Sequence, residues 1–93
     1  MFKVNEYYDG KVKSLSFISD DGPATIGVMA PGEYEFSTNS TEYMTVTSGV
    51  MNVMLSSQTA WKAYKPYETF IVPANGKFKV KCSVDTAYKC LYK

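Results

Sequence analysis

Glu42 is the acidic residue with the most informative setting in this 93-residue chain, because it begins EYMTVTSG, a stretch of strand-forming residues that ends in glycine. A carboxylate inside a β-structure can bind a metal ion or accept hydrogen bonds from sugar hydroxyls. The chain has no histidine, and its ten basic residues are all lysine. It therefore lacks the usual proton shuttle and metal ligand of neutral pH, and the bidentate side chain that binds phosphate.

The formal net charge is +1, and acids and lysines are scattered along the chain. Such a distribution produces no strong field toward nucleic acid or an anionic membrane. Neither a signal peptide nor an apolar run of membrane length is present in the sequence, so we expect a cytoplasmic protein. Cys82 and Cys90 lack the C-x-x-C spacing of zinc or redox sites, and we interpret them as reduced thiols packed in the core.

The C-terminal part of the chain shows the period of half-buried strands most clearly. In KFKVKCSV (77–84) lysines alternate with four inward residues, namely Phe78, Val80, Cys82 and Val84. TAYKCLYK (86–93) repeats the alternation with Tyr88, Cys90 and Tyr92 on one face. With Asp85 in a turn between them, these two segments are expected to form a hairpin.

Earlier segments have the same character and are separated by stretches rich in turn-forming residues. The further expected strands are 11–18, 24–29, 33–37, 42–48, 50–55 and 68–72. About eight or nine short strands at a spacing of ~8 to 12 residues predict an all-β sandwich or barrel, with residues 1–93 as a single domain. A closed barrel is favoured because closure removes exposed strand edges.

The run GEYEFSTNSTEYMTVTSG resembles the first motif of the cupin barrels, G-x5-H-x-H-x3,4-E-x6-G. Gly32 matches its start and Glu42 begins its tail, but Thr38 and Ser40 stand at the histidine positions. YETFIVPANGKF is similar to the second motif, in which Phe78 replaces the histidine. The resemblance implies a single-domain, jelly-roll-like cupin barrel that has lost the other metal ligands and works without a metal.

The resemblance extends beyond these motifs in NEYYDGKVKS, GPATIGVMAPGEYEFST, EYMTVTSGVMNV, FIVPANGKF, TAYKCLY and Trp61. On these residues nearly the whole chain resembles the small pyrimidine/purine nucleoside phosphorylases of bacteria. The resemblance implies a cytosolic pentosyltransferase that cleaves many nucleosides with inorganic phosphate, giving free base and pentose 1-phosphate with no cofactor. The chain departs from its relatives at Pro66, Tyr67 and Leu91.

Phosphorolysis passes through an oxocarbenium-like state, so a site must hold phosphate, orient the ribose and tolerate charge on the leaving base. Ribose hydroxyls are expected to bind Glu42, which is the predicted catalytic residue. Phosphate is expected near backbone N–H groups and four side chains: Thr25, Thr38, Ser40 and Lys13. Stacking walls for purines and pyrimidines alike are expected from Tyr34, Phe36, Phe78, Tyr88 and Tyr92.

Each of these residues also has a structural interpretation. Glu42 could be satisfied by barrel hydroxyls and backbone, the aromatic residues could be core, and Lys13 could belong to a solvated strand face. At the level of function, the alternative is a metal-free cupin that binds a small ligand without catalysis. A barrel for single-stranded nucleic acid is disfavoured by the near-neutral charge, and a metalloenzyme by the missing ligands.

The expected partners are nucleosides and phosphate, with no nucleic acid and no membrane. Exposed strand edges on so small a barrel favour a homodimer. Trp61, the single tryptophan, is interpreted as a packing residue at a barrel end or as a dimer contact.

Overall fold

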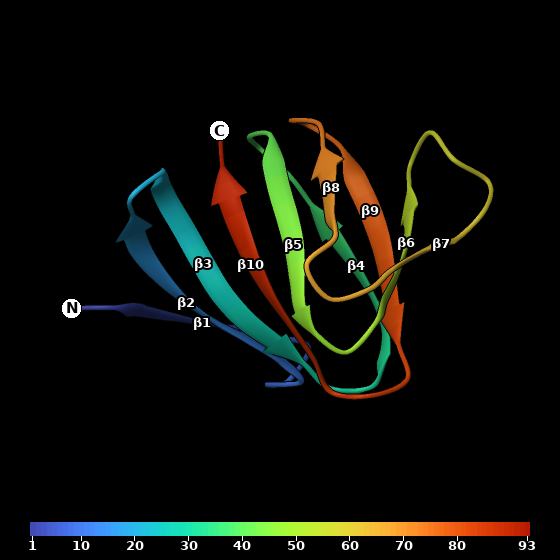
Figure 1. Cartoon of the computed structure of the whole chain (residues 1–93), viewed down its shortest axis with the longest axis horizontal. Coiled ribbons are helices and arrows are strands. Elements are labelled where there is room, and N and C mark those ends of the chain that lie inside the picture. The colour runs from blue at the N-terminus through green and yellow to red at the C-terminus, as the bar shows by residue number, and fades with distance from the viewer.

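The computed structural model describes residues 1–93 and consists of ten strands joined by turns and loops (Figure 1). The strands are β1 (Lys3–Tyr7), β2 (Val12–Ser19), β3 (Gly22–Met29), β4 (Gly32–Ser37), β5 (Glu42–Ser48), β6 (Met51–Leu55), β7 (Lys62–Tyr64), β8 (Thr69–Val72), β9 (Lys77–Cys82) and β10 (Thr86–Tyr92). None of its segments is a helix long and apolar enough to cross a membrane. The all-β prediction is confirmed.

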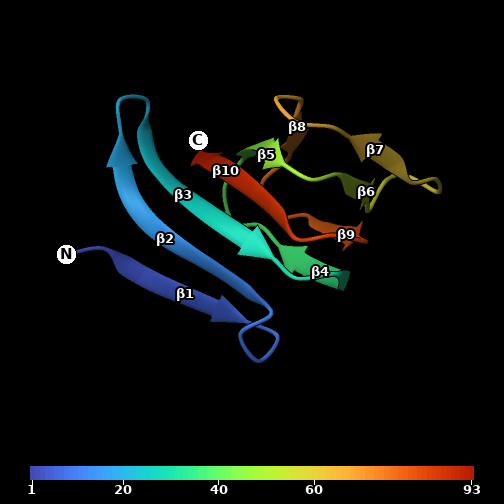
Figure 2. The same ribbon diagram turned by 60° about the horizontal axis from the view of Figure 1, so that its bottom comes forward.

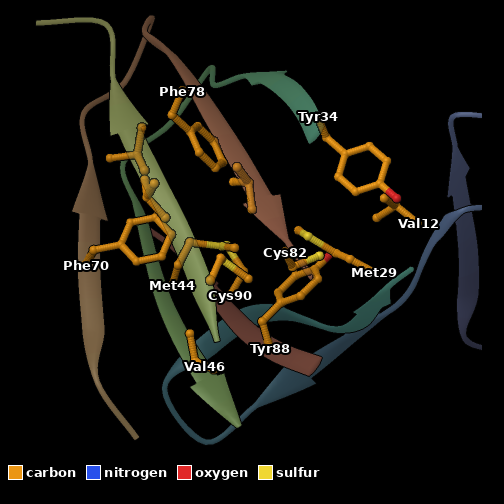
Figure 3. Packing of buried hydrophobic residues seen from close by; sticks show 14 residues of the cluster. Val12, Met29, Tyr34, Met44, Val46, Phe70, Phe78, Cys82, Tyr88 and Cys90 are labelled. Atoms are coloured by element: carbon orange, nitrogen blue, oxygen red, sulfur yellow. The ribbon is translucent and has the colours of Figure 1, made fainter. Parts of the chain in front are cut away.

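The strands form two antiparallel sheets, a six-stranded sheet ordered β1-β2-β3-β10-β5-β8 and a four-stranded sheet ordered β4-β9-β6-β7. Their inner faces share one hydrophobic cluster, to which side chains from both sheets contribute (Figure 3). Strict alternation along β9 buries Phe78, Val80 and Cys82 and leaves the intervening lysines exposed. Burying one such apolar side chain contributes about 1.5–3 kcal/mol, which explains why the pattern dictates the face.

The predicted C-terminal hairpin is wrong. β9 pairs with β4 and β6 in the four-stranded sheet, whereas β10 pairs with β3 and β5 in the six-stranded sheet. The link between them crosses from one sheet to the other, and Val84, expected inside, is 51% exposed. Alternation defines which face of a strand is buried but not which strand lies beside it, so a hairpin and a crossover have the same signature.

Strands β1 and β7 were not expected from the sequence. β1 pairs only with β2 and has no fully buried residue, so it lacks the apolar face that marks a strand. The turn that joins β1 to β2 is tight, with positive φ angles of 54° at Tyr8, 57° at Asp9 and 83° at Gly10. Tyr67, one of the departures noted above, also has a positive φ, of 72°.

No strand pairing joins the two sheets, so the expected closure by hydrogen bonds is not observed. The edges are β1 and β8 in one sheet and β4 and β7 in the other. Figure 2 shows the long, curved strands β2 and β3 with β1 at their outer side. The barrel shape thus arises from two curved sheets that face each other, and the seam between β4 and the β1–β2 turn is held by side chains.

Candidate active site

A cavity of about 430 Å³ lies between the two sheets, beside the edge strand β4 and the β1–β2 turn. The six-stranded sheet lines it with Ser14, Met29, Glu42, Met44, Tyr88, Cys90 and Tyr92. The four-stranded sheet contributes Glu35, Phe36, Ser37 and Phe78, and the end of β1 and its turn contribute Tyr7 and Tyr8. The cavity is therefore lined by apolar and aromatic side chains from both sheets, with polar groups on each side.

Glu42 opens β5 on the inner face of the sheet, opposite Val72 of β8 and Tyr92 of β10. Its one hydrogen bond comes from the thiol of Cys90, which donates to Oε1 at 3.6 Å. Burial raises the pKa of Glu42 above its ordinary value, and the hydrogen bond from Cys90 offsets part of that shift. Because a thiol is a weak donor, the carboxylate is poorly stabilised in its charged form.

No lysine lines the cavity, so no cation compensates Glu42 there. Lys13 lies on the outer face of β2 with its side chain 60% exposed and its Nζ 3.7 Å from a carboxylate oxygen of Glu6. A metal is not favoured by the donors present either, since no group of three or more His, Cys, Asp or Glu side chains is arranged to hold one. The cavity thus holds Glu42 among neutral side chains, and its second carboxyl group belongs to Glu35, an exposed residue of β4.

Tyr88 of β10 is buried and lies directly opposite Gly27 of β3. A Cβ atom at Gly27 would lie 2.4 Å from the Tyr88 ring, so only glycine leaves room for that ring across β3. Burial, with a smaller contribution from Cys90, raises the pKa of Tyr88 to about 12, and the Ser14 hydroxyl partly offsets the shift. Ser14 in turn accepts a hydrogen bond from Asn5 Nδ2 at 3.1 Å.

Cys90 and Tyr92, farther along β10, are also neutral. Burial and the negative charge of Glu42 raise the pKa of Cys90 to about 12. Burial likewise raises the pKa of Tyr92, whose hydroxyl is 3.0 Å from Thr25 Oγ1. The thiol and both phenols of β10 keep their protons at neutral pH and act as uncharged hydrogen-bonding groups.

Tyr8 closes the seam between the two sheets. Its hydroxyl donates to the backbone oxygen of Glu35 at 2.5 Å and accepts from the backbone N–H of Glu35 at 2.9 Å. One phenol thus satisfies both edge groups of a β4 residue that a further strand would otherwise bind. The rings of Tyr7 and Tyr8 both meet Phe36 with centroids 5.9 Å apart, so the turn forms one side of the cavity.

The structure places Glu42 and Tyr88 at the cavity together with Phe36, Phe78 and Tyr92. The other predicted site residues lie outside its lining. Tyr34 donates to the backbone oxygen of Ala30 at 2.7 Å, and Thr38 donates to that of Pro73 at 2.7 Å and accepts from the N–H of Gly76 at 3.0 Å. Ser40 is half-buried in the β4–β5 loop, Lys13 faces outward, and Thr25 reaches the cavity only through Tyr92.

Eight lining residues were not predicted as site residues: Tyr7, Tyr8, Ser14, Met29, Glu35, Ser37, Met44 and Cys90. The segment YYDG contains the Asp-Gly pair that marks a tight hairpin turn, and it was the available signal for β1 and its turn. Ser14 sits between outward residues in KVKSLS, so the alternation that defines β2 would have directed it inward. Because serine is polar, Ser14 was not recognised as an inward residue.

Comparison with known proteins covers the whole chain. A family model described as pyrimidine/purine nucleoside phosphorylase matches residues 2–92. A protein of that name from Pseudomonas savastanoi pv. phaseolicola is 58% identical over 93 residues, which is 100% of both chains. Another, from Alcanivorax borkumensis, is 55% identical over 92 residues and covers 99% of this chain and 98% of its own.

Solved structures agree with the fold. A Vibrio parahaemolyticus protein described as of unknown function superposes with a TM-score of 0.93 at 39% identity, covering 97% of this chain and 96% of its own. An RmlC-like cupin from Shewanella frigidimarina has a TM-score of 0.74 at 16% identity and covers 96% of this chain and 80% of its own. The second likeness shows that the cupin fold was correctly predicted.

Proposed function

Because the chain belongs to the pyrimidine/purine nucleoside phosphorylase family, we propose that it transfers the pentose of purine and pyrimidine nucleosides to inorganic phosphate. The products are the free base and pentose 1-phosphate. The observation that carries the proposal is the cavity between the sheets, in which Glu42 is the inward carboxyl group of a chain related to these proteins along its full length.

The cavity suits a nucleoside in size and in lining. Its volume of about 430 Å³ falls within the range of about 300–1,000 Å³ that is usual for small-molecule sites. Phe36 and Phe78 offer an aromatic wall on the four-stranded side. Stacking on such a wall does not depend on the hydrogen-bond pattern of a base, which supports action on purines and pyrimidines alike.

Phosphate must then be held largely by neutral groups, because no lysine lines the cavity. Six side chains of the lining carry a hydroxyl group, and of these we assign Ser14, Ser37 and Tyr88 to phosphate; Ser37 lies at the exposed edge of β4. These residues replace the phosphate contacts expected from the sequence, namely Thr25, Thr38, Ser40 and Lys13. We further propose that the reaction needs no metal cofactor, since no three His, Cys, Asp or Glu side chains are grouped to hold a metal ion.

A homodimer in the cytoplasm completes the proposal. The outer face of the six-stranded sheet carries an apolar row in which Val4 pairs with Leu15 and Leu15 with Ile26, with exposed fractions of 58%, 46% and 44%. A second copy of the chain, placed about a two-fold axis, would cover this row.

Trp61, the other dimer contact considered from the sequence, lies under Lys81, whose Nζ is 4.3 Å from the ring centroid. Sedimentation equilibrium tests the proposed homodimer, and a protein that is monomeric at every concentration would contradict it.

The lack of a cation in the cavity favours a second candidate, a cupin that binds a neutral nucleoside or base without turning it over. The two functions differ in one reaction. Purified protein is incubated with uridine or adenosine, with and without phosphate, and base and pentose 1-phosphate are measured. We expect both products only with phosphate, loss of them in Glu42→Gln, and full activity in Glu6→Gln, a matched change at an exposed carboxylate. Binding with no product identifies the non-catalytic cupin.

A further inference from the structure

The phosphate co-substrate poses an electrostatic problem for this cavity. Inorganic phosphate carries between one and two negative charges near neutral pH. The acidic side chains at the cavity are Glu42 inside and Glu35 at its exposed edge, and no lysine lies between them. Like charges repel strongly in a partly desolvated site, so an ionised Glu42 would oppose phosphate binding. A neutral Glu42 would not.

The surroundings of Glu42 favour the neutral form from every side. β10 presents Tyr88, Cys90 and Tyr92, none of which is charged at neutral pH. β8 presents Val72 directly opposite. Across the cavity lie Tyr7, Tyr8 and Glu35, and the last of these adds negative charge. The charged form of Glu42 is stabilised by the weak bond from Cys90 alone.

From this geometry we propose that Glu42 works as a neutral carboxylic acid and donates its proton to the departing base of the nucleoside. The inference rests on the proposed function and goes beyond it, because it assigns a chemical role to one side chain. It differs from the ribose contact expected from the sequence, in which Glu42 would act as an ionised acceptor.

The step balances without a further reagent. A phosphate oxygen forms a bond to the anomeric carbon while the bond from that carbon to the base nitrogen breaks, and the electron pair remains on the base. The carboxyl proton of Glu42 moves to the base, which leaves as a neutral molecule. The proton of hydrogen phosphate, which becomes acidic when the ester forms, returns to the carboxylate of Glu42. Glu42 is thereby restored for the next turnover.

The other acidic groups of the cavity are worse donors. Burial raises the pKa values of Tyr88 and Cys90 to about 12, so their protons are held too tightly to be given to a leaving base at neutral pH. Burial also raises the pKa of Tyr92. Glu35 is exposed, and its backbone rather than its carboxyl group is engaged by Tyr8. Glu42 is the acid that is both inside the cavity and shifted toward neutral pH.

Leaving groups that need no proton provide the test. In 7-methylguanosine the base already carries a positive charge and departs as a neutral species without an acid. We expect Glu42→Gln, which keeps the size and the hydrogen-bonding reach of the side chain, to lower kcat/KM about 10²–10⁴-fold on guanosine. On 7-methylguanosine the same variant should lose less than about 10-fold, because the acid contributes only to the first reaction. Glu6→Gln should leave both substrates unaffected.

The unmodified protein provides a second, independent readout. Plotted against pH, the ratio of kcat/KM on guanosine to that on 7-methylguanosine should fall as pH rises, because Glu42 loses the proton that only guanosine needs. Titration of phosphate and of any shared binding group cancels in this ratio once the known ionisation of each free nucleoside is corrected. This measurement remains decisive if Glu42→Gln fails to fold.

The outcomes distinguish the proton-donor role of Glu42 from the proposed phosphorolysis itself. An equal loss on both substrates, or a flat ratio, overturns the proton donor and leaves Glu42 as a ligand of the sugar, with phosphorolysis intact. If the unmodified protein cleaves neither nucleoside, the proposed function fails and the proton donor fails with it.

Discussion

The inner faces of the two sheets are built for different tasks. The six-stranded sheet presents Glu42, Tyr88, Cys90 and Tyr92 to the cavity, and burial raises the pKa of each of them. The four-stranded sheet presents apolar side chains to the shared cluster, among them Phe36, Met51, Val53, Phe78 and Val80. Both sheets contribute apolar side chains to the cluster, but the cavity groups with raised pKa values all come from the six-stranded sheet, whereas the four-stranded sheet contributes the two phenylalanines of the lining, Phe36 and Phe78.

The position of each strand explains this division. β10 lies between β3 and β5, and β5 lies between β10 and β8, so both carry hydrogen-bonded neighbours on each side. Groups on such strands are held more rigidly than groups on loops, as a catalytic site requires. We therefore expect a truncation in the four-stranded sheet away from the cavity to lower stability with little effect on activity, and a change beside Tyr88 in the six-stranded sheet to lower activity as well as stability.

Met51→Ala should have the largest effect on stability. Met51 is fully buried on β6 of the four-stranded sheet and does not line the cavity. Truncation should cost about 2–5 kcal/mol in the free energy of unfolding, because a cavity replaces the side chain. Urea unfolding measures the loss, and activity at a temperature where the variant is folded should be retained. A folded but inactive variant would show that the core of the four-stranded sheet contributes to activity.

Gly27→Ala tests the six-stranded sheet. The new methyl group would lie 2.4 Å from the Tyr88 ring and must displace it, at a cost of about 1–3 kcal/mol for overpacking. Activity should fall by more than in Met51→Ala, since Tyr88 lines the cavity. The double change Gly27→Ala with Tyr88→Ala has no clash, so its total loss of stability should be smaller than the sum of the two single losses. Additive losses in urea unfolding would contradict this contact.

Tyr8→Phe addresses the seam between the sheets. It removes the hydroxyl that bonds the backbone of Glu35 but keeps the ring against Tyr34 and Phe36. Stability should fall by about 0.5–1.5 kcal/mol, the usual value of a hydrogen bond. The Glu35 amide should exchange hydrogen with solvent faster, which NMR can measure. Tyr7→Phe is the matched control, and an unchanged Glu35 amide in Tyr8→Phe would remove the role of Tyr8 in the seam.

The smallest expected effect is the contribution of Glu42 to the pH dependence of the free energy of unfolding. The folded state raises the pKa of Glu42, so it binds a proton more tightly than the unfolded chain does. Its contribution to stability is therefore most favourable at low pH and declines as pH rises from the ordinary carboxyl value through the raised one. Glu42→Gln should lack this decline when unfolding is measured between pH 4 and pH 8, and a parallel dependence in both proteins would contradict the raised pKa.

The sequence predicted the elements that have an apolar period. β9 and β10 were recognised from their alternation, and the E-x6-G spacing directed attention to Glu42, which the structure places on an inner face. It did not reveal that β9 and β10 belong to different sheets, because alternation carries no information about neighbours.

The candidate site was less predictable because much of it depends on long-range contacts. Thr38 and Ser40 were expected to contact phosphate, but β4 ends at Ser37 and the chain then enters a loop, where the buried Thr38 binds the Pro73–Gly76 turn. Tyr8 gains its role from Glu35 on β4, a partner that no local pattern indicates. Tyr8 and Thr38 are positioned by distant partners that the local sequence does not reveal, whereas Ser14 lies on a recognised strand and was missed because it is polar.

The most direct test of this division is a crystal structure of the Glu42→Gln variant with guanosine and phosphate bound. We expect the base to pack against Phe36 and Phe78, and the substituted side chain of residue 42 to lie within about 2.6–3.2 Å of an acceptor atom on the base. Phosphate should lie on the other side of the anomeric carbon, near the hydroxyls of the cavity. A nucleoside bound outside the cavity, or one whose base lies beyond the reach of residue 42, would contradict it.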